Sequence, residues 1–304
     1  MKKIEQLLQC IQNNDDHSHS MLQEIFPGVY LYFTRLYSQD TSYHHEAFKN
    51  VLAIEYCYEG RIGWTTHKGN SVYLGPGDFA VHTLDNCTNS SISLPNGYYK
   101  GISIYIDNDQ LHSDSIPFFS NSHILFRDLI NKFCQQYHFA SFAGNEQTAG
   151  IFTYFFHQLE QTQSLYWKIK TIELLAYLLN IDYNSTFQLT EYRAEQVAII
   201  RQIHDDLISH LEKRLTIDSL SRKYLMNATT MKAIFKDVYG DPIATHIKKH
   251  RMNTATKLLL ESDKTITEIA KNTGYESASK FARAFKEHYQ LSPNQFRKQH
   301  KKTH

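Results

Sequence analysis

The stretch GYESASKFARAFKEHYQLSPNQFR (Gly274–Arg297) has a counterpart about fifty residues earlier, in LMNATTMKAIFKDVYGDP (Leu225–Pro242). Each contains an apolar residue followed four positions later by Phe-Lys, beginning at Met231 and at Phe281, with a tyrosine three residues after the lysine. Residues four apart lie on the same face of a helix. The repeat therefore predicts that the chain builds one small helical unit twice.

The second copy has the signals of a helix-turn-helix. In KTITEIAKNTGYESASKFARAFK, Thr265 and Glu268 have the spacing of a capping box at the start of a short helix, and Gly274 suits the turn. Ser277 is placed to cap the next helix, which has an apolar face and an opposite, polar face. The inward residues are Phe281, Ala284 and Phe285, and the outward residues are Ser279, Lys280 and Arg283, with Lys286 expected near phosphate.

The first copy follows the same plan. Thr216 is placed to cap one short helix and Asn227 is placed to cap the next. The second of these helices again divides into two faces. Its inward residues are Met231, Ile234 and Phe235, and its outward residues are Thr229, Thr230 and Ala233, flanked by Lys232 and Lys236.

A helix with an apolar inner face and short polar or cationic outer residues suits recognition in the major groove of DNA. Arginine can contact guanine with two hydrogen bonds, and lysine can contact guanine or phosphate. Between the two units, DPIATHIKKHRMNTATKLLLES predicts a helix of about 18 residues, roughly 27 Å long. Such a helix can hold two recognition helices about one DNA turn apart, roughly 34 Å. The duplication thus predicts that one chain contacts two successive major grooves.

The charge of the chain is divided between its two halves. Residues 196–304 contain 20 basic and 11 acidic residues, and residues 1–195 contain 12 basic and 20 acidic residues. The net charge of +1 therefore hides a basic half of +9 and an acidic half of −8. This asymmetry favours a polyanionic partner for the basic half.

The acidic half predicts a sheet followed by helices. From about residue 28 to 107, short β-rich runs alternate with turn sequences such as EGR, KGN, GPGD and PNG, which is typical of a small barrel or jelly roll. After Pro117 the apolar spacing becomes helical over about 122–137, 146–160 and 164–181. The last of these segments has an apolar stripe. We expect this stripe either to form a dimer interface or to pack on the sheet. The stripe consists of Ile169, Ile172, Leu175, Ala176 and Leu179.

Histidines and aromatic residues of this half are candidates for a site. A cupin metal site requires a His-x-His pair, but His44 and His45 are adjacent and would point to opposite faces of a strand. We therefore expect no metal and no cofactor from the group His44, His45, His67, His82, Glu46 and Glu55. The predicted effector-binding residues are Tyr56, Tyr58, Trp64 and Tyr73, and the alternative is that these rings belong to the core.

The four cysteines, at positions 10, 57, 87 and 134, are far apart and have no C-x-x-C spacing. That pattern favours reduced thiols and a cytoplasmic protein. The chain has no apolar run of 18 residues, and its first residues lack the apolar core of a signal peptide. We expect neither a leader nor a membrane span.

Residues from about 196 to 300 resemble the DNA-binding domain of the AraC/XylS family of bacterial transcription regulators. The matching pieces are LTIDSLSRKYLMNATTMKAIFK, RMNTATKLLLES, ITEIAKNTGYESASKFARAFK and LSPNQFRK. The stretch MKAIFKDVYGDPIATHIKKHRM is most similar to the pyochelin-regulator branch, whose members respond to siderophores. More loosely, YLGPGDFAVH resembles a strand–turn–strand of the cupin-like barrel that family members carry.

The resemblance implies an α+β fold with four parts. These are a cupin-like effector-binding barrel over residues 1–120, a helical dimerisation segment over 121–183, a linker over 184–195 and an all-helical domain with two helix-turn-helix units over 196–304. It also implies a sequence-specific regulator, mostly an activator in this family, with double-stranded DNA, RNA polymerase, a small-molecule effector and a second copy of the chain as partners.

Carried over by position, the base-contacting residues of the family fall on Thr229, Lys232 and Ala233 in the first unit and on Ser279, Lys280 and Arg283 in the second. Two positions depart from the family at the first turn, where Ser221 and Leu225 replace a small alanine and a glycine, and Gln290 replaces a frequent glycine. Leucine tolerates a positive φ poorly, so this turn is expected to be strained or built differently.

Two other interpretations stay open. One is a metal-dependent cupin enzyme fused to a DNA-binding domain, and the other is a ligand-free regulator controlled by protein partners. No nucleophile–base pair, phosphate-binding loop or paired carboxylates stand out in the sequence. We therefore predict no catalytic residues and no enzymatic activity.

Overall fold

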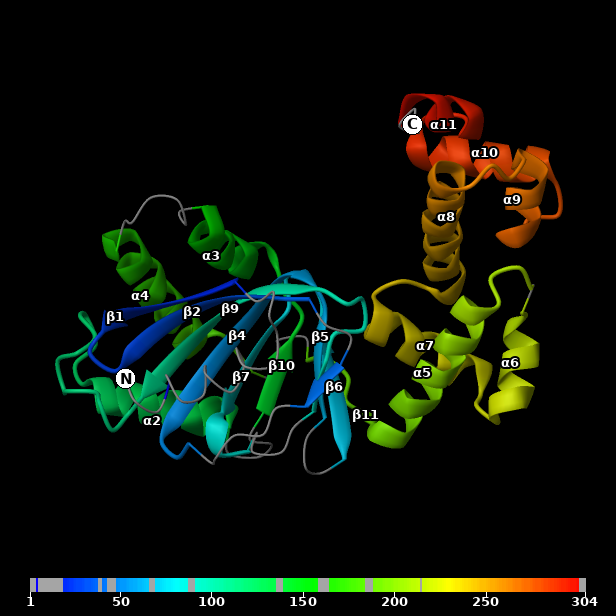
Figure 1. Cartoon of the computed structure of the whole chain (residues 1–304). Coiled ribbons are helices and arrows are strands. Elements are labelled where there is room, and N and C mark those ends of the chain that lie inside the picture. Colours follow the sequence, from blue (N-terminus) through cyan, green and yellow to red (C-terminus); the bar gives the residue numbers. More distant parts are fainter. Residues whose placement is uncertain are drawn as a thin grey trace. The chain divides into compact units, whose positions relative to one another are not determined.

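The computed structural model describes residue 4 and residues 19–37, 40–42, 48–65, 69–86, 91–134, 139–157, 164–183, 188–213 and 215–300. The chain divides into two compact units, residues 1–194 and 195–304 (Figure 1). His44, His45, Glu46 and His67 of the predicted histidine group lie outside the described residues.

The first unit contains two antiparallel sheets. The six-stranded sheet has the order β1 (His19–Phe26), β2 (Val29–Leu36), β9 (Tyr99–Asp107), β4 (Val51–Gly60), β7 (Phe79–Thr83) and β10 (Phe139–Phe142). The five-stranded sheet has the order β11 (Tyr192–Arg193), β6 (Asn70–Leu74), β5 (Ile62–Thr65), β8 (Ser91–Ser93) and β3 (Asp40–Ser42), and a short 3-10 helix η1 spans Leu84–Asn86. Among the described strands, both sheets are open, so the predicted cupin-like barrel is not confirmed.

Three helices cover one face of the six-stranded sheet (Figure 1). They are α2 (Ser122–Phe133), α3 (Glu146–His157) and α4 (Ser164–Asn180). Alternate residues of the central strands, such as Leu52 and Ile54 of β4, join the side chains of these helices in one core. The ring of Tyr56 stacks on Phe152 of α3 with 4.2 Å between ring centres. The other face of β4 contributes Cys57 to a second core between the two sheets.

Helix α4 is oriented differently from the predicted stripe. Leu175 is fully buried in the core, whereas Ile169 is 52% exposed. The face that is buried consists of Trp167, Thr171, Leu174, Leu175 and Leu178. The helix is apolar on more than one side, so its periodicity alone did not identify which side meets the sheet.

The predicted linker over 184–195 is attached to the first unit along its described part. The backbone N–H of Leu189 donates to the carbonyl of Ser141 at 2.9 Å, and Tyr192 of β11 pairs with Ser71 of β6. Helix α5 then begins at Ala194. Within residues 188–193, Gln188 forms a β-bridge with Phe142 and Tyr192–Arg193 form β11, whereas residues 189–191 have no regular secondary structure.

The second unit is helical. Its helices are α5 (Ala194–Ser209), α6 (Ile217–Tyr224), α7 (Ala228–Tyr239), α8 (Ile243–Glu261), α9 (Ile266–Asn272), α10 (Ala278–Tyr289) and α11 (Pro293–His300). Helices α6 and α7 form the first helix-turn-helix, and α9 and α10 form the second. Over the residues that the structure describes, we find no helix with the length and apolar character needed to cross a membrane.

Candidate nucleic-acid interface

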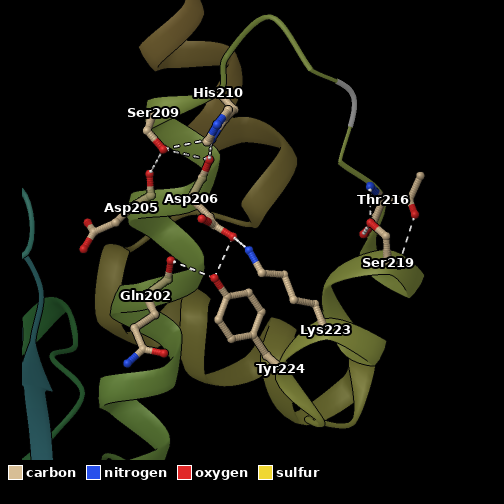
Figure 2. Close-up of polar contacts among 9 residues, drawn as sticks. All are labelled: Gln202, Asp205, Asp206, Ser209, His210, Thr216, Ser219, Lys223 and Tyr224. Carbon is tan, nitrogen blue, oxygen red and sulfur yellow. Dashed lines mark hydrogen bonds and ion pairs between the residues drawn. The ribbon is translucent and has the colours of Figure 1, made fainter.

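The first helix-turn-helix is built from the predicted caps. The hydroxyl of Thr216 accepts from the backbone N–H of Ser219, and the Ser219 hydroxyl accepts from the N–H of Thr216, which forms a capping box for α6 (Figure 2). The side chain of Asn227 accepts from the N–H of Thr229 at 2.8 Å and so starts α7. Both predicted caps are confirmed, and each satisfies backbone donors that the helix leaves free.

A polar contact joins α6 to α5. The carboxylate of Asp206 accepts a short hydrogen bond from Lys223 and a 2.6 Å hydrogen bond from the Tyr224 hydroxyl (Figure 2). The hydrogen bond from Lys223, together with that from Tyr224, lowers the pKa of Asp206. Because Lys223 is 59% exposed and water reaches the half-buried Asp206, the contact orients the helices and adds little stability.

Helix α7 has the two predicted faces. Its residues Met231, Ile234 and Phe235 are fully buried. The predicted DNA-contacting residues are on the opposite side: Thr229, Lys232, Ala233 and Lys236 are exposed, and Thr230 is half-buried.

The turn between α6 and α7 contains a residue in the left-handed conformation that is not a glycine. Leu225 has φ +49° and ψ +35° and its side chain is 94% exposed. The hydroxyl of Ser221 donates to the carbonyl of Met226 at 2.6 Å and braces the same turn. The two departures from the family pattern thus occur together: the serine adds a hydrogen bond across a turn in which leucine is strained.

The second helix-turn-helix is capped in the same way. The N–H and hydroxyl of Thr265 donate to the carboxylate of Glu268, which lowers the pKa of that carboxyl, and the Thr265 hydroxyl accepts from the N–H of Glu268. Ser277 caps α10 by accepting from the N–H of Lys280. Gly274 has φ +74°, and a Cβ at this position would lie 2.2 Å from the carbonyl oxygen of Leu211. Only glycine fits this turn.

Helix α10 presents a polar outer face. Phe281 and Phe285 are fully buried. On the other side, the predicted residues Ser279, Lys280, Arg283 and Lys286 are all exposed. Two of them are paired with neighbouring carboxylates, Lys280 with Glu276 and Arg283 with Glu287.

Helix α8 separates the two recognition helices, which begin fifty residues apart at Ala228 and Ala278. It has 19 residues, so its length is about 28 Å. It contacts α7 near its start and α9 and α11 further along. The predicted connecting helix is therefore present, within one residue of the expected length.

The four predicted effector-binding residues do not form one site. Tyr56 is 3% exposed in the core beneath α3, and Trp64 is 6% exposed between the sheets. Tyr73 is 5% exposed, with its ring against Gly63. Tyr58 is partly buried, and the ammonium of Lys100 lies 4.5 Å from its ring centre.

The histidines that lie close together in the structure are not those considered in the sequence analysis. Of that group, His82 is described; it is 2% exposed, with Nε2 3.6 Å from a carboxylate oxygen of Glu55. A different cluster lies in the second unit, where His204, His246 and His250 approach one another. Its signal in the sequence was the four-residue spacing of His246 and His250 on a helix.

Comparison with known proteins identifies the second unit. A helix-turn-helix domain family matches residues 220–299. PqrA of Proteus vulgaris, described as a "Probable transcription factor", is 32% identical over 99 residues, which are 31% of this chain and 81% of PqrA. The transcriptional regulator AlkR of Acinetobacter baylyi is 31% identical over 88 residues, and the match covers 29% of this chain and only 29% of AlkR.

Solved structures match the same region. The C-terminal domain of the response regulator AraT from Geobacillus stearothermophilus is 28% identical, with a TM-score of 0.34, and covers 34% of this chain and 88% of that domain. These matches do not distinguish a pyochelin-regulator branch. Because the match to PqrA extends over most of that protein, the chain belongs to the AraC family of helix-turn-helix transcriptional regulators, which are DNA-binding proteins and not enzymes.

Proposed function

We propose that this protein is a sequence-specific transcriptional regulator that contacts two successive major grooves through α7 and α10. The observation that supports the proposal is the duplicated arrangement of faces: each helix buries large apolar side chains on one face and exposes polar and cationic side chains on the other. The basic charge of residues 196–304, +9 in total, supplies the attraction to phosphate.

The test is selection of bound duplexes from a random library by the full chain. We expect two blocks of preferred bases, centred about 10 base pairs apart, because the two helices would enter neighbouring grooves on one side of DNA. Thr229→Ala should alter one block and Ser279→Ala the other. Lys264→Ala, which removes an exposed charge outside both recognition helices, is the control and should alter neither. Selection of no preferred sequence would refute the proposal.

We also propose that the first unit binds a small-molecule effector beside Lys100. A cavity of about 180 Å³ lies there, lined by Ser20, Met21, Phe33, Thr34, Arg35, Lys100, Gly101 and Phe156. Two basic side chains beside apolar rings favour a small organic anion with an apolar part. Of the four predicted residues, Tyr58 contacts two lining residues: its ring stacks on Phe156 at 4.1 Å, and the ammonium of Lys100 lies 4.5 Å from its ring centre.

Thermal shift with small carboxylates, fatty acids and siderophores tests this site, because a ligand that binds only the folded state stabilises it. Lys100→Met should abolish the shift, and Lys168→Met should retain it. Once an effector is found, its affinity should differ with and without operator DNA, since linkage requires each ligand to change the affinity of the other by the same factor. Equal affinities would show that the effector does not control DNA binding.

The proposal also includes the oligomeric state of the protein and whether it activates or represses transcription. We propose a homodimer that pairs through the exposed apolar residues of α3 and α4, namely Tyr154, Leu165 and Ile169. The rings of Tyr154 and Tyr166 are 5.9 Å apart, so α3 and α4 contact each other beside these residues. As in most of the family, we propose activation through RNA polymerase. Transcription with purified polymerase should rise when the protein is added to a template carrying its site.

A further inference from the structure

Three histidines of the second unit come together beneath the first recognition helix. His204 lies on α5, and His246 and His250 lie one turn apart on α8. The nitrogen atoms that they can offer to a ligand all lie within 4.8 Å of one another. The ring centres are 4.6 Å apart for His246 and His250, and 5.1 and 5.9 Å from these two to His204. A pair of histidines four residues apart presents both imidazoles on one face of a helix, as in helical zinc sites.

His246 has a buried nitrogen without a hydrogen-bond partner. The residue is 5% exposed, and its Nε2 has no acceptor or donor within the described part of the chain. Its ring packs against Phe235 and Tyr239, at 5.4 and 5.0 Å between ring centres. Leaving such a buried group unpaired carries a cost in stability. A ligand on this nitrogen would remove that cost.

His204 is held in an orientation that suits a metal ligand. Its Nδ1 lies 3.2 Å from a carboxylate oxygen of Asp205. A hydrogen bond from Nδ1 to this carboxylate leaves Nε2 with the lone pair that a metal needs, and such carboxylate–histidine contacts support metal sites in other proteins. Burial also lowers the pKa of His204, His246 and His250, which favours the neutral, metal-binding form of each ring.

We propose that His204, His246 and His250 form a binding site for a divalent transition-metal ion. Imidazole nitrogen prefers zinc, copper, nickel and related ions to magnesium or calcium. Tetrahedral coordination at about 2.0–2.1 Å needs ligand nitrogens roughly 3.3 Å apart, so the side chains must close slightly around the ion. Water would complete the coordination.

The surroundings place this site under the DNA-contacting helix. The ring of His204 stacks on Tyr239, the last residue of α7, with 4.2 Å between ring centres and 7° between planes. An ion bound here would tie α5 to α8 at the end of α7. Lys249 and Asp241 offset each other as an ion pair at 2.6 Å, and the carboxylate of Asp205 adds a negative charge beside His204.

Titration of the full chain with Co²⁺, followed by visible absorption, tests the proposal, since tetrahedral cobalt absorbs far more strongly than the hydrated ion. The chain has 17 histidines, so the decisive result is a difference between variants. We expect His250→Gln and His204→Gln each to lose one tight equivalent of Co²⁺ and the stabilisation by Zn²⁺. His288→Gln, which changes an exposed histidine of α10, should retain both. Asp205→Asn should weaken binding roughly 10- to 100-fold.

Circular dichroism shows whether each variant is folded. If His250→Gln does not fold, the Co²⁺ titration of His204→Gln tests the site instead. Equal Co²⁺ stoichiometry and affinity in the wild type and in the folded variant would overturn the proposal. A wild-type protein that binds no Co²⁺ would overturn it as well. Neither result bears on DNA binding, which is measured separately.

Discussion

Arg283 and Glu287 form an ion pair on the outer face of α10, in which the arginine Nε donates to a carboxylate oxygen at 3.1 Å. The two side chains are 85% and 53% exposed. The other carboxylate oxygen of Glu287 lies 3.7 Å from the ammonium of Lys248 on α8. One acidic side chain therefore holds two cations on the face that is proposed to meet DNA.

Removal of this carboxylate should strengthen DNA binding. An exposed ion pair stabilises by about 0.2–1 kcal/mol, so Glu287→Gln should raise affinity for DNA by up to roughly fivefold. Glu261→Gln removes the same charge at the end of α8 and is the matched control. Fluorescence anisotropy at one salt concentration measures both. An equal gain in the two variants would show that only net charge matters.

Arg283 and Lys286 should have different roles on the same helix. Arg283→Ala should cost about 1–3 kcal/mol and relax the preference at one base position, because arginine can pair with guanine. Lys286→Ala should weaken binding to all sequences alike and reduce the salt dependence, because we expect a phosphate contact. Binding to a panel of single-base variants of the selected site distinguishes them. Uniform losses in both variants would show that Arg283 does not contact a base.

The left-handed residues at the ends of α6 and α10 should limit stability. Leu225 and Gln290 have φ of +49° and +59°, which costs a residue with a side chain about 1–2 kcal/mol. Replacement by glycine removes this strain, but the flexibility of glycine in the unfolded chain offsets part of the stabilisation. Leu225→Gly and Gln290→Gly should therefore each raise the free energy of unfolding by about 0.5–1 kcal/mol. Gly274→Ala should destabilise, since its Cβ would clash with Leu211. Urea unfolding measures all three, and a less stable Leu225→Gly protein would contradict the prediction.

Two substitutions in α4 separate core from interface. Leu175 is fully buried, so Leu175→Asp should unfold the first unit, because it places a charge in the core. Ile169 is 52% exposed, so Ile169→Asp should leave the fold intact and yield a monomer if α4 forms the dimer contact. Sedimentation with circular dichroism measures both outcomes. A dimeric Ile169→Asp protein would exclude this surface.

The described cysteines should be unreactive in the folded protein. Burial raises the pKa of Cys134 from its ordinary value of 9.0 to about 12, and burial also raises the pKa of Cys57. Both thiols therefore stay protonated at pH 7–8, whereas the thiolate is the reactive form. Because the folded pKa lies above the unfolded one, these groups remove stability as the pH rises from about 9 towards 12. Alkylation followed by mass spectrometry should label both only after unfolding, and labelling of Cys134 in the native protein at pH 8 would contradict this.

Some features of this protein follow from the sequence alone. The sequence patterns agree with the structure in the helix caps, in the buried faces of α7 and α10 and in the length of α8. The caps are Thr216, Asn227, Thr265 and Ser277. Each cap depends on residues within about one helical turn of one another, and each helical face depends on a spacing of three or four residues that repeats along the helix. Side chains three or four positions apart meet in any helix, whatever packs beside it.

Other features depend on tertiary structure. Contacts between distant parts of the chain determine which face of α4 is buried, the order of strands in the two open sheets and the pairing of β11 with β6. The histidine cluster is of this kind, since the sequence places His246 and His250 together but does not bring His204 to them. Short apolar segments pack in several ways that have the same periodicity, and the arrangement that buries the most surface is selected only when the whole unit folds.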